Sequence, residues 1–202
     1  KCLLIKNADV YAPQPLGIVD ILIINDKIAK IGQQLAAPQG LDCQILDAQK
    51  RKVVPGYVDQ HVHIIGGGGE SGPYSRTPEI NLSELTKVGI TTVVGVLGTD
   101  GTSRHNESLL AKARGLTHEG ITAYMLTGSY EIPLHNMTGD VRRDIILINE
   151  CLGIGEVALS DHRSSQPTRE ELEKVLTQAR LGGMLSGKAG VVQFHMGVGS
   201  VA

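Results

Sequence analysis

Residues 55–70 read PGYVDQHVHIIGGGGE, and this stretch decides the fold. It predicts an apolar strand that ends in His61 and His63 and leads directly into four glycines. Side chains two residues apart point to the same face of a strand. Both imidazoles can therefore bind one metal ion while Val62 packs on the other face. Because this strand opens a parallel series that should be covered on both faces, a metal site is favoured over two solvated polar residues.

From Val53 onward, apolar runs alternate with amphipathic helices, which is typical of parallel βα units. The expected strands are 58–63, 90–97, 121–126, 153–159 and 191–194. The expected helices are one opened by Thr77 and Pro78 and closed by Gly89, then 106–119, 140–150, and one that begins at Thr168 with capping-box spacing to Glu171 and ends at Gly182-Gly183.

Two α/β architectures fit five strands. A doubly wound sheet needs no more, whereas a (β/α)8 barrel needs about 250 residues and 148 residues follow residue 54. The polar residues favour the barrel, which gathers its strand ends in one ring. The residues at or just beyond a strand end are His61, His63, Glu70, Thr99, Asp100, Tyr130, Asp161, His162, Arg163 and His195. We therefore predict a (β/α)8 barrel truncated after its fifth strand.

Residues 1–54 form a separate small β unit in this interpretation, with strands at 2–6, 17–24, 27–31 and 43–46. The predicted domains are 1–54, the N-terminal part of a small β-sandwich domain, and 55–202, the first four βα units plus the fifth strand. Cys2, Cys43 and Cys151 are odd in number and widely spaced, which predicts reduced, buried thiols.

Composition excludes several classes of function. The formal net charge is −2 and aromatic residues make up 3% of the chain, so neither a nucleic-acid surface nor an anionic membrane surface is indicated. The longest apolar runs are far shorter than the about 18 residues that span a bilayer. We expect no membrane partner, no signal peptide and a cytoplasmic location.

Two glycine patterns offer a competing, nucleotide-binding interpretation. Gly67, Gly69 and Gly72 satisfy the dinucleotide fingerprint, and Asp100 could be its ribose-binding acid. Prolines delay the following helix, however, so its N-terminus would miss the pyrophosphate. Residues 182–188 have phosphate-loop spacing, but a helix precedes them where a strand is required.

Glu156 lies inside a short apolar strand, where an isolated carboxylate is costly unless it is paired or binds a metal. A salt bridge is the alternative, and Asp161 to Arg163 could belong to the same structural cluster. His195 ends the fifth strand and is a further candidate ligand.

Four further motifs are more specific than the paired-histidine pattern alone. They are VGVLGTD at 94–100, MLTGSY at 125–130, SDHR at 160–163 and FHMG at 194–197. With them the chain resembles the amidohydrolase superfamily and, within it, the isoaspartyl dipeptidases, over essentially its whole length from Val53. The resemblance implies two divalent metal ions, zinc, and hydrolysis of the β-aspartyl bond of dipeptides by a metal-bound hydroxide. His61 and His63 would hold one ion and His195 the other. Glu156 would bridge them where many relatives have a carboxylated lysine.

The resemblance also implies a substrate site for a small dipeptide. Gly68 and Glu70 would bind its ammonium group, while Thr99 and Arg163 would bind carboxylates, Arg163 through its fork. Tyr130 would be the catalytic hydrogen-bond donor to the developing oxyanion. A further histidine ligand and a proton-shuttling aspartate are expected on later strands. We accordingly expect residues 1–202 alone to be inactive and poorly folded, and the enzyme to be a homo-oligomer.

Two other functions stay open at this point. A cyclic amidohydrolase, similar to a hydantoinase or a dihydroorotase, would share the metal residues, although Glu70 and the turn at 127–130 favour a dipeptide. The second alternative is a non-catalytic scaffold with a decayed barrel. The candidate ligands His61, His63, Glu156 and His195 are all present, which argues against such decay.

Overall fold

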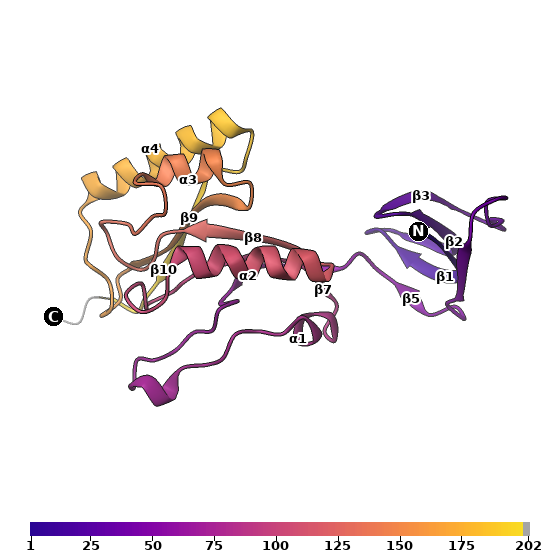
Figure 1. Cartoon of the computed structure of the whole chain (residues 1–202), viewed down its shortest axis with the longest axis horizontal. Coiled ribbons are helices and arrows are strands. Elements are labelled where there is room, and N and C mark those ends of the chain that lie inside the picture. The colour runs from indigo at the N-terminus through magenta and orange to yellow at the C-terminus, as the bar shows by residue number, and fades with distance from the viewer. Residues whose placement is uncertain (200–202) are drawn as a thin grey trace. The chain divides into compact units, whose positions relative to one another are not determined.

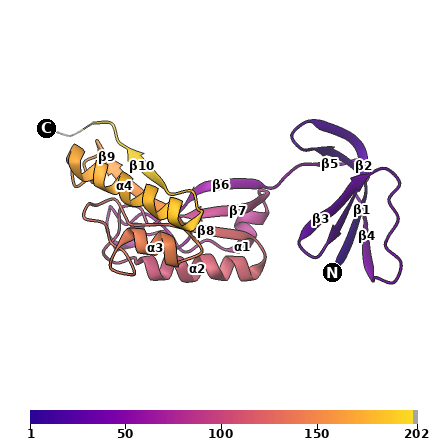
Figure 2. The same ribbon diagram turned by 90° about the horizontal axis from the view of Figure 1, so that it is seen from above.

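The computed structural model describes residues 1–199. The chain divides into two compact units, Lys1–Gly56 and a second unit that begins at Tyr57 (Figures 1 and 2). The assignment of these units to part of a β-sandwich domain and to the first units of a barrel stays a prediction.

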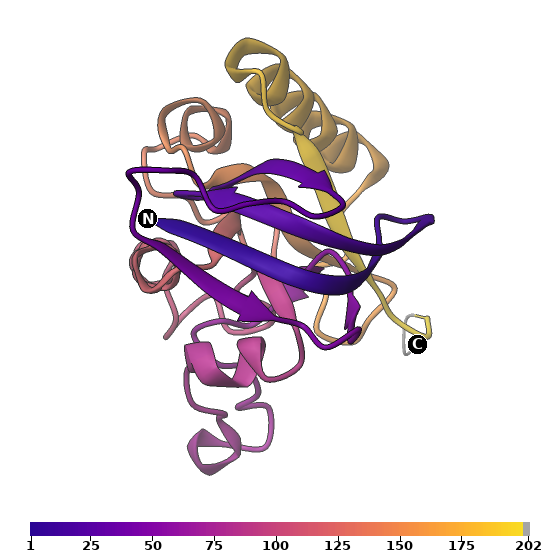
Figure 3. The same cartoon turned by 90° about the vertical axis from the view of Figure 1, so that its right-hand side faces the viewer.

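The first unit is one mixed sheet with strand order β3-β2-β1-β4, in which β5 also pairs with β1 (Figure 3). Its strands are β1 (Cys2–Tyr11), β2 (Pro15–Ile24), β3 (Lys27–Gly32), β4 (Cys43–Asp47) and β5 (Lys52–Val53). β1 is antiparallel to β2 and parallel to β4. A small apolar cluster of Ala8, Val10, Val19 and Ile21 forms its core.

A disulfide joins Cys2 to Cys43 in this sheet. The two residues are direct partners in the parallel register of β1 and β4, with Cα atoms 4.5 Å apart. The prediction of reduced thiols was wrong for this pair, because a separation of 41 residues along the chain hides their adjacency in the sheet. Cys151 is free and buried, and burial raises the pKa of its thiol to about 12.

The second unit is built on a parallel half-barrel sheet with strand order β10-β9-β8-β7-β6 (Figure 2). Its strands are β6 (Tyr57–Val62), β7 (Ile90–Gly95), β8 (Thr122–Thr127), β9 (Cys151–Leu159) and β10 (Val191–Met196). A doubly wound sheet reverses its strand order at a switch point, whereas here spatial order follows chain order without reversal. The predicted α/β barrel-type fold is confirmed, with five strands present.

Helices α1 (Leu82–Thr86), α2 (Asn106–Glu119), α3 (Val141–Leu147) and α4 (Arg169–Ser186) pack on one face of the sheet. The short 3-10 helix η1 (Pro73–Ser75) lies in the loop after β6 and has no buried residue. The core between helices and sheet contains Val93, Leu109, Leu116, Met125 and Ile145, all fully or almost fully buried.

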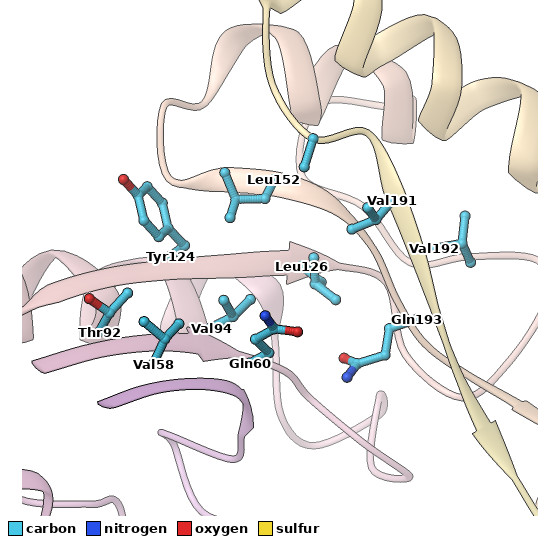
Figure 4. A pocket seen from close by; sticks show the side chains of 11 residues that line it. Val58, Gln60, Thr92, Val94, Tyr124, Leu126, Leu152, Val191, Val192 and Gln193 are labelled. Atoms are coloured by element: carbon cyan, nitrogen blue, oxygen red, sulfur yellow. The ribbon is translucent and has the colours of Figure 1, made fainter. Parts of the chain in front are cut away.

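The other face of the sheet is concave and mainly apolar, with a hollow of about 430 Å³ (Figure 4). Alternate residues of the five strands line it, as the period of two of a strand requires. They include Val58, Gln60, Thr92, Val94, Leu126, Leu152, Val191 and Gln193.

The first helix is shorter than predicted. It begins at Leu82, after Asn81, whose backbone N–H donates to the Glu84 carboxylate at 2.7 Å. The expected start at Thr77 was wrong because the Thr77 hydroxyl accepts the backbone N–H of Gly67 at 2.8 Å and so fixes the glycine loop instead. Among the described residues only the three-residue 3-10 helix η1 begins at these glycines, and the first α-helix begins at Leu82, which removes the basis for the dinucleotide interpretation.

α4 continues through Gly182-Gly183, where the sequence predicted its end. These glycines serve close packing: a Cβ on Gly182 would lie 3.0 Å from Ile145, and one on Gly183 would lie 2.5 Å from the Gly190 Cα. The helix ends instead at Gly187, which has the left-handed conformation with φ 69°. Residues 182–186 are thus helical, and a phosphate loop is excluded there.

None of the helices found in residues 1–199 is long and apolar enough to cross a membrane.

Leu109 is 0% exposed between α2 and the sheet. Replacing Leu109 by Ala should lower the free energy of unfolding by about 2–5 kcal/mol, because it removes buried methyl groups and leaves a cavity. Leu147→Ala, at a position that is 59% exposed, is the matched control and should change stability by about 0.5 kcal/mol or less. Urea denaturation of both variants measures the difference, and equal effects would contradict this packing.

Candidate metal centre and substrate site

The carboxyl ends of β6 and β9 bring two histidines and a glutamate together. The Nε2 atoms of His61 and His63 lie 3.2 Å and 3.6 Å from the Glu156 Oε1. One possible ligand atom from each of the three residues lies within 4.8 Å of the others. Gly98 permits this approach, because a Cβ there would lie 2.6 Å from the His63 ring. The two residues predicted from the HxH pattern thus share one site with the predicted strand carboxylate.

Glu156 is only 1% exposed, and its Oε1 has no hydrogen-bond partner among the described residues. A buried carboxylate oxygen is costly to leave unpaired. Imidazole nitrogens and carboxylate oxygens are ligands of divalent cations such as zinc. The donor set and the unpaired oxygen therefore fit a metal ion.

His195, at the end of β10, faces the other oxygen of the same carboxylate. Its Nδ1 lies 3.0 Å from the Glu156 Oε2 and 2.9 Å from the Tyr130 hydroxyl. It is not part of the compact group that His61, His63 and Glu156 form. Glu156 therefore presents one oxygen to His61 and His63 and the other to His195.

Tyr130 is 4% exposed and lies directly beyond β8. Burial, followed by the negative charge of Glu156, raises the pKa of its phenol to about 12. The guanidinium carbon of Arg163 lies 5.1 Å from the centre of its ring. Tyr130 is thus a protonated hydroxyl donor at neutral pH beside the candidate ligands.

The Arg163 guanidinium binds the Asp161 carboxylate through two N–H groups and is therefore not free. Its Nε and Nη2 donate to the two Asp161 oxygens at 2.9 Å and 3.0 Å, and Nη1 donates to Glu70 at 3.1 Å. These bonds hold the pKa of the Asp161 carboxyl well below its usual range and raise the pKa of Arg163. The sequence predicts Asp161 only as part of a structural cluster with its neighbours. The Asp-x-Arg spacing at a strand end was the signal that could have assigned it to the site.

The remaining predicted substrate residues lie around a second hollow, of about 340 Å³, beside this network. Gly68, Glu70 and Thr99 line it together with Arg76, Asp100 and Ser103. The structure therefore gathers the residues proposed from the sequence around the carboxyl edge of the sheet. Arg76 and Arg104, which bind the loops here, were not found from the sequence because neither stands in a recognisable motif.

A parallel half-barrel whose strand ends carry this site defines an α/β enzyme fold similar to that of the amidohydrolase-type barrel enzymes. Among solved structures, the chain is similar to the β-aspartyl dipeptidase of Fervidobacterium islandicum AW-1, with 45% identity and a TM-score of 0.94 over 99% of this chain and 55% of that chain. A structure of that dipeptidase in complex with a β-Asp-Leu dipeptide matches with 46% identity and a TM-score of 0.93, over 98% of this chain and 52% of that one.

Other relatives share less. A dihydroorotase of Staphylococcus aureus is 39% identical over 90 residues, which are 45% of this chain and 20% of that protein. A D-hydantoinase of a Thermus species, with 20% identity and a TM-score of 0.60 over 96% of this chain and 40% of that chain, shares the fold. No protein-family model matches the chain. The chain spans about half the length of the two dipeptidase structures.

In metal-free protein, Tyr130 should stay protonated at about pH 11, where an ordinary tyrosine is largely ionised. The wild type and Tyr130→Phe should then show the same tyrosinate absorbance, a signal that the absence of tryptophan keeps clean. In denaturant, where burial and the nearby Glu156 charge no longer act on Tyr130, the wild type should exceed the variant by one tyrosinate. A full tyrosinate of difference in the folded protein would contradict the raised pKa.

Proposed function

We propose that the protein with this chain hydrolyses the β-aspartyl peptide bond of dipeptides at a centre of two divalent metal ions. The observation that carries the proposal is the buried Glu156, whose two oxygens face His61 and His63 on one side and His195 on the other. The similarity to a dipeptidase solved with β-Asp-Leu supports the choice of substrate.

His61 and His63 would hold one ion, His195 would contribute to the second, and Glu156 would bridge them. Zinc is the ion that we propose, because imidazole and carboxylate ligands suit it. Such ions, when bound, polarise the scissile carbonyl and activate water for attack.

Tyr130 supplies the hydrogen bond that this reaction needs at the carbonyl oxygen. Negative charge develops on that oxygen in the transition state, and a positioned hydroxyl donor stabilises it there. A phenol carries its proton at neutral pH, so Tyr130 has a hydrogen to donate. The Tyr130 hydroxyl lies 2.9 Å from the Nδ1 of His195, a candidate ligand, which supports this role.

Glu70 and Arg163 provide opposite charges for the two ends of a free dipeptide. In this structure they neutralise each other at 3.1 Å. We propose that the substrate ammonium group takes the place of Arg163 beside Glu70, with Gly68 adjacent, and that substrate carboxylates bind Arg163 and Thr99. A ligand that carries both charges offsets the loss of the ion pair, whereas a neutral ligand does not.

Hydrolysis of a cyclic amide is the second candidate, because the 39% identity over 90 residues is to a dihydroorotase. The Glu70 to Arg163 ion pair favours the dipeptide, since dihydropyrimidine and hydantoin rings carry no ammonium group for Glu70. A scaffold without catalysis would bind no metal, so metal analysis separates it from both enzymes. The homo-oligomeric state and the cytoplasmic location stay predictions.

Glu156→Gln keeps the shape of the side chain but removes its charge. The variant should retain fewer metal ions than the two per chain expected of wild type after zinc loading and dialysis, because an amide is a poor bridging ligand. Elemental analysis measures this. Glu79→Gln, at an exposed carboxylate that pairs with Lys112, is the control and should keep both ions. An unchanged metal content in Glu156→Gln would defeat the bridging role.

The protein should hydrolyse β-Asp-Leu in preference to α-Asp-Leu, and Arg163→Lys should lower kcat/KM for β-Asp-Leu by about 10- to 100-fold. Lysine keeps the charge but cannot bind both Asp161 oxygens and still hold a further N–H group in place for a substrate carboxylate, and a hydrogen bond to a charged group contributes about 1.5–3 kcal/mol. The control is Arg169→Lys, because Arg169 is an exposed arginine that pairs with Glu173 on α4. Equal turnover of the two dipeptides by the wild type would refute the proposed specificity.

A further inference from the structure

The loop that carries Glu70 is rich in glycine, so its backbone is not held in one conformation by its own residues. Gly66, Gly68 and Gly69 have φ values of 82°, 68° and 109°, a region that suits glycine and leaves the free chain many alternatives. A Cβ on Gly68 would lie 2.6 Å from the Ser75 carbonyl oxygen, so the loop is also tightly folded on itself. A glycine-rich loop of this kind presents a carboxylate at a defined place only if something holds it.

The Arg104 side chain binds the backbone of this glycine loop. Its Nη2 donates to the Gly67 carbonyl at 2.8 Å and its Nη1 to the Gly68 carbonyl at 3.0 Å. The side chain is 5% exposed, and a buried guanidinium is costly unless its N–H groups and charge are matched. The planar fork donates from two separate nitrogens to two successive carbonyls at a fixed spacing, whereas a lysine ammonium group donates from a single nitrogen without that fixed geometry.

We call Arg104 and its two hydrogen bonds to the Gly67 and Gly68 carbonyls the clamp. The Asp100 carboxylate pairs with the Arg104 charge and connects the clamp to the loop after β7. Its Oδ2 lies 3.5 Å from the Arg104 Nη1 and accepts from the Arg76 Nη1 at 2.9 Å. Its Oδ1 accepts the backbone N–H of Ser103 at 2.7 Å. Asp100 directly follows Thr99, so one carboxylate ties the loop after β6 to the loop after β7.

The clamp lies next to the hollow where the substrate residues meet. Gly68, Glu70, Thr99 and Asp100 line this 340 Å³ space, whereas Arg104 does not. Arg104 therefore acts through the residues that it holds.

We propose that Arg104, with Asp100, is a positioning residue that sets the distance between Glu70 and Thr99 and thereby the affinity for dipeptides with a free ammonium group. The inference rests on the proposed function for its substrate, and on the hydrogen bonds above for the clamp itself.

The test compares Arg104→Met and Arg104→Lys with the wild type in the metal-loaded protein. Arg104→Met should raise KM for β-Asp-Leu about 10-fold or more, a loss of about 1.4 kcal/mol in binding, while kcat changes less. Hydrogen exchange of the amides of residues 66–72 should become faster, and metal content should stay the same. Arg104→Lys should restore part of the KM, because its ammonium group can reach one carbonyl.

Arg114→Met is the matched control, because Arg114 is an exposed arginine of α2 that forms a salt bridge with Glu150. It should change neither KM nor exchange in residues 66–72. If Arg104→Met does not fold, Asp100→Asn and Arg104→Lys give the same readouts.

The proposal is overturned if the Arg104 variants lose thermal stability while KM and loop exchange stay at wild-type values. It is also overturned if kcat falls with KM unchanged. A wild type that does not hydrolyse dipeptides would defeat the proposed function, and exchange in residues 66–72 would then decide whether Arg104 clamps the loop.

Discussion

The Glu156 carboxylate, buried at the carboxyl edge of the parallel sheet, is the constraint on which the rest of the site depends. A charged group in this position is stable only if both oxygens are matched by partners of opposite charge or by hydrogen bonds. One oxygen meets His195, while the other lies against His61 and His63 without a hydrogen bond among residues 1–199. The surrounding strands thus bring imidazole nitrogens to a buried carboxylate, a donor set that fits a metal ion.

Charge around this carboxylate is organised in alternating signs. Arg163 separates Asp161 from Glu70, and Arg104 with Arg76 surrounds Asp100. In each group the arginine fork fixes carboxylates or carbonyls at a set geometry. Under the proposed function, a small ligand with charges of both signs would replace one of these internal ion pairs.

The errors of sequence reasoning arose where a residue serves a distant contact. Gly182 and Gly183 look like a helix end, but they lie within α4 because Ile145 and Gly190 pack against them. Thr77 looks like a helix cap, but its hydroxyl binds the glycine loop. Cys2 and Cys43 look unrelated until the β1 and β4 register makes them neighbours. In each case the deciding partner is far away in the chain, and local patterns do not contain it.

The parallel βα organisation, the HxH histidine pair at the end of β6 and the polar residues at each later strand end can be predicted from the sequence alone. These features follow from periodicities of two and 3.6 and from the side chains that end each apolar run. Only the tertiary structure decided that Glu156 divides its oxygens between two histidine groups, that Asp161 holds the Arg163 fork, and that the Arg104 fork holds the Gly67 and Gly68 carbonyls. These contacts depend on register between strands and on rotamers of long side chains, which are settled by packing rather than by the order of residues along the chain.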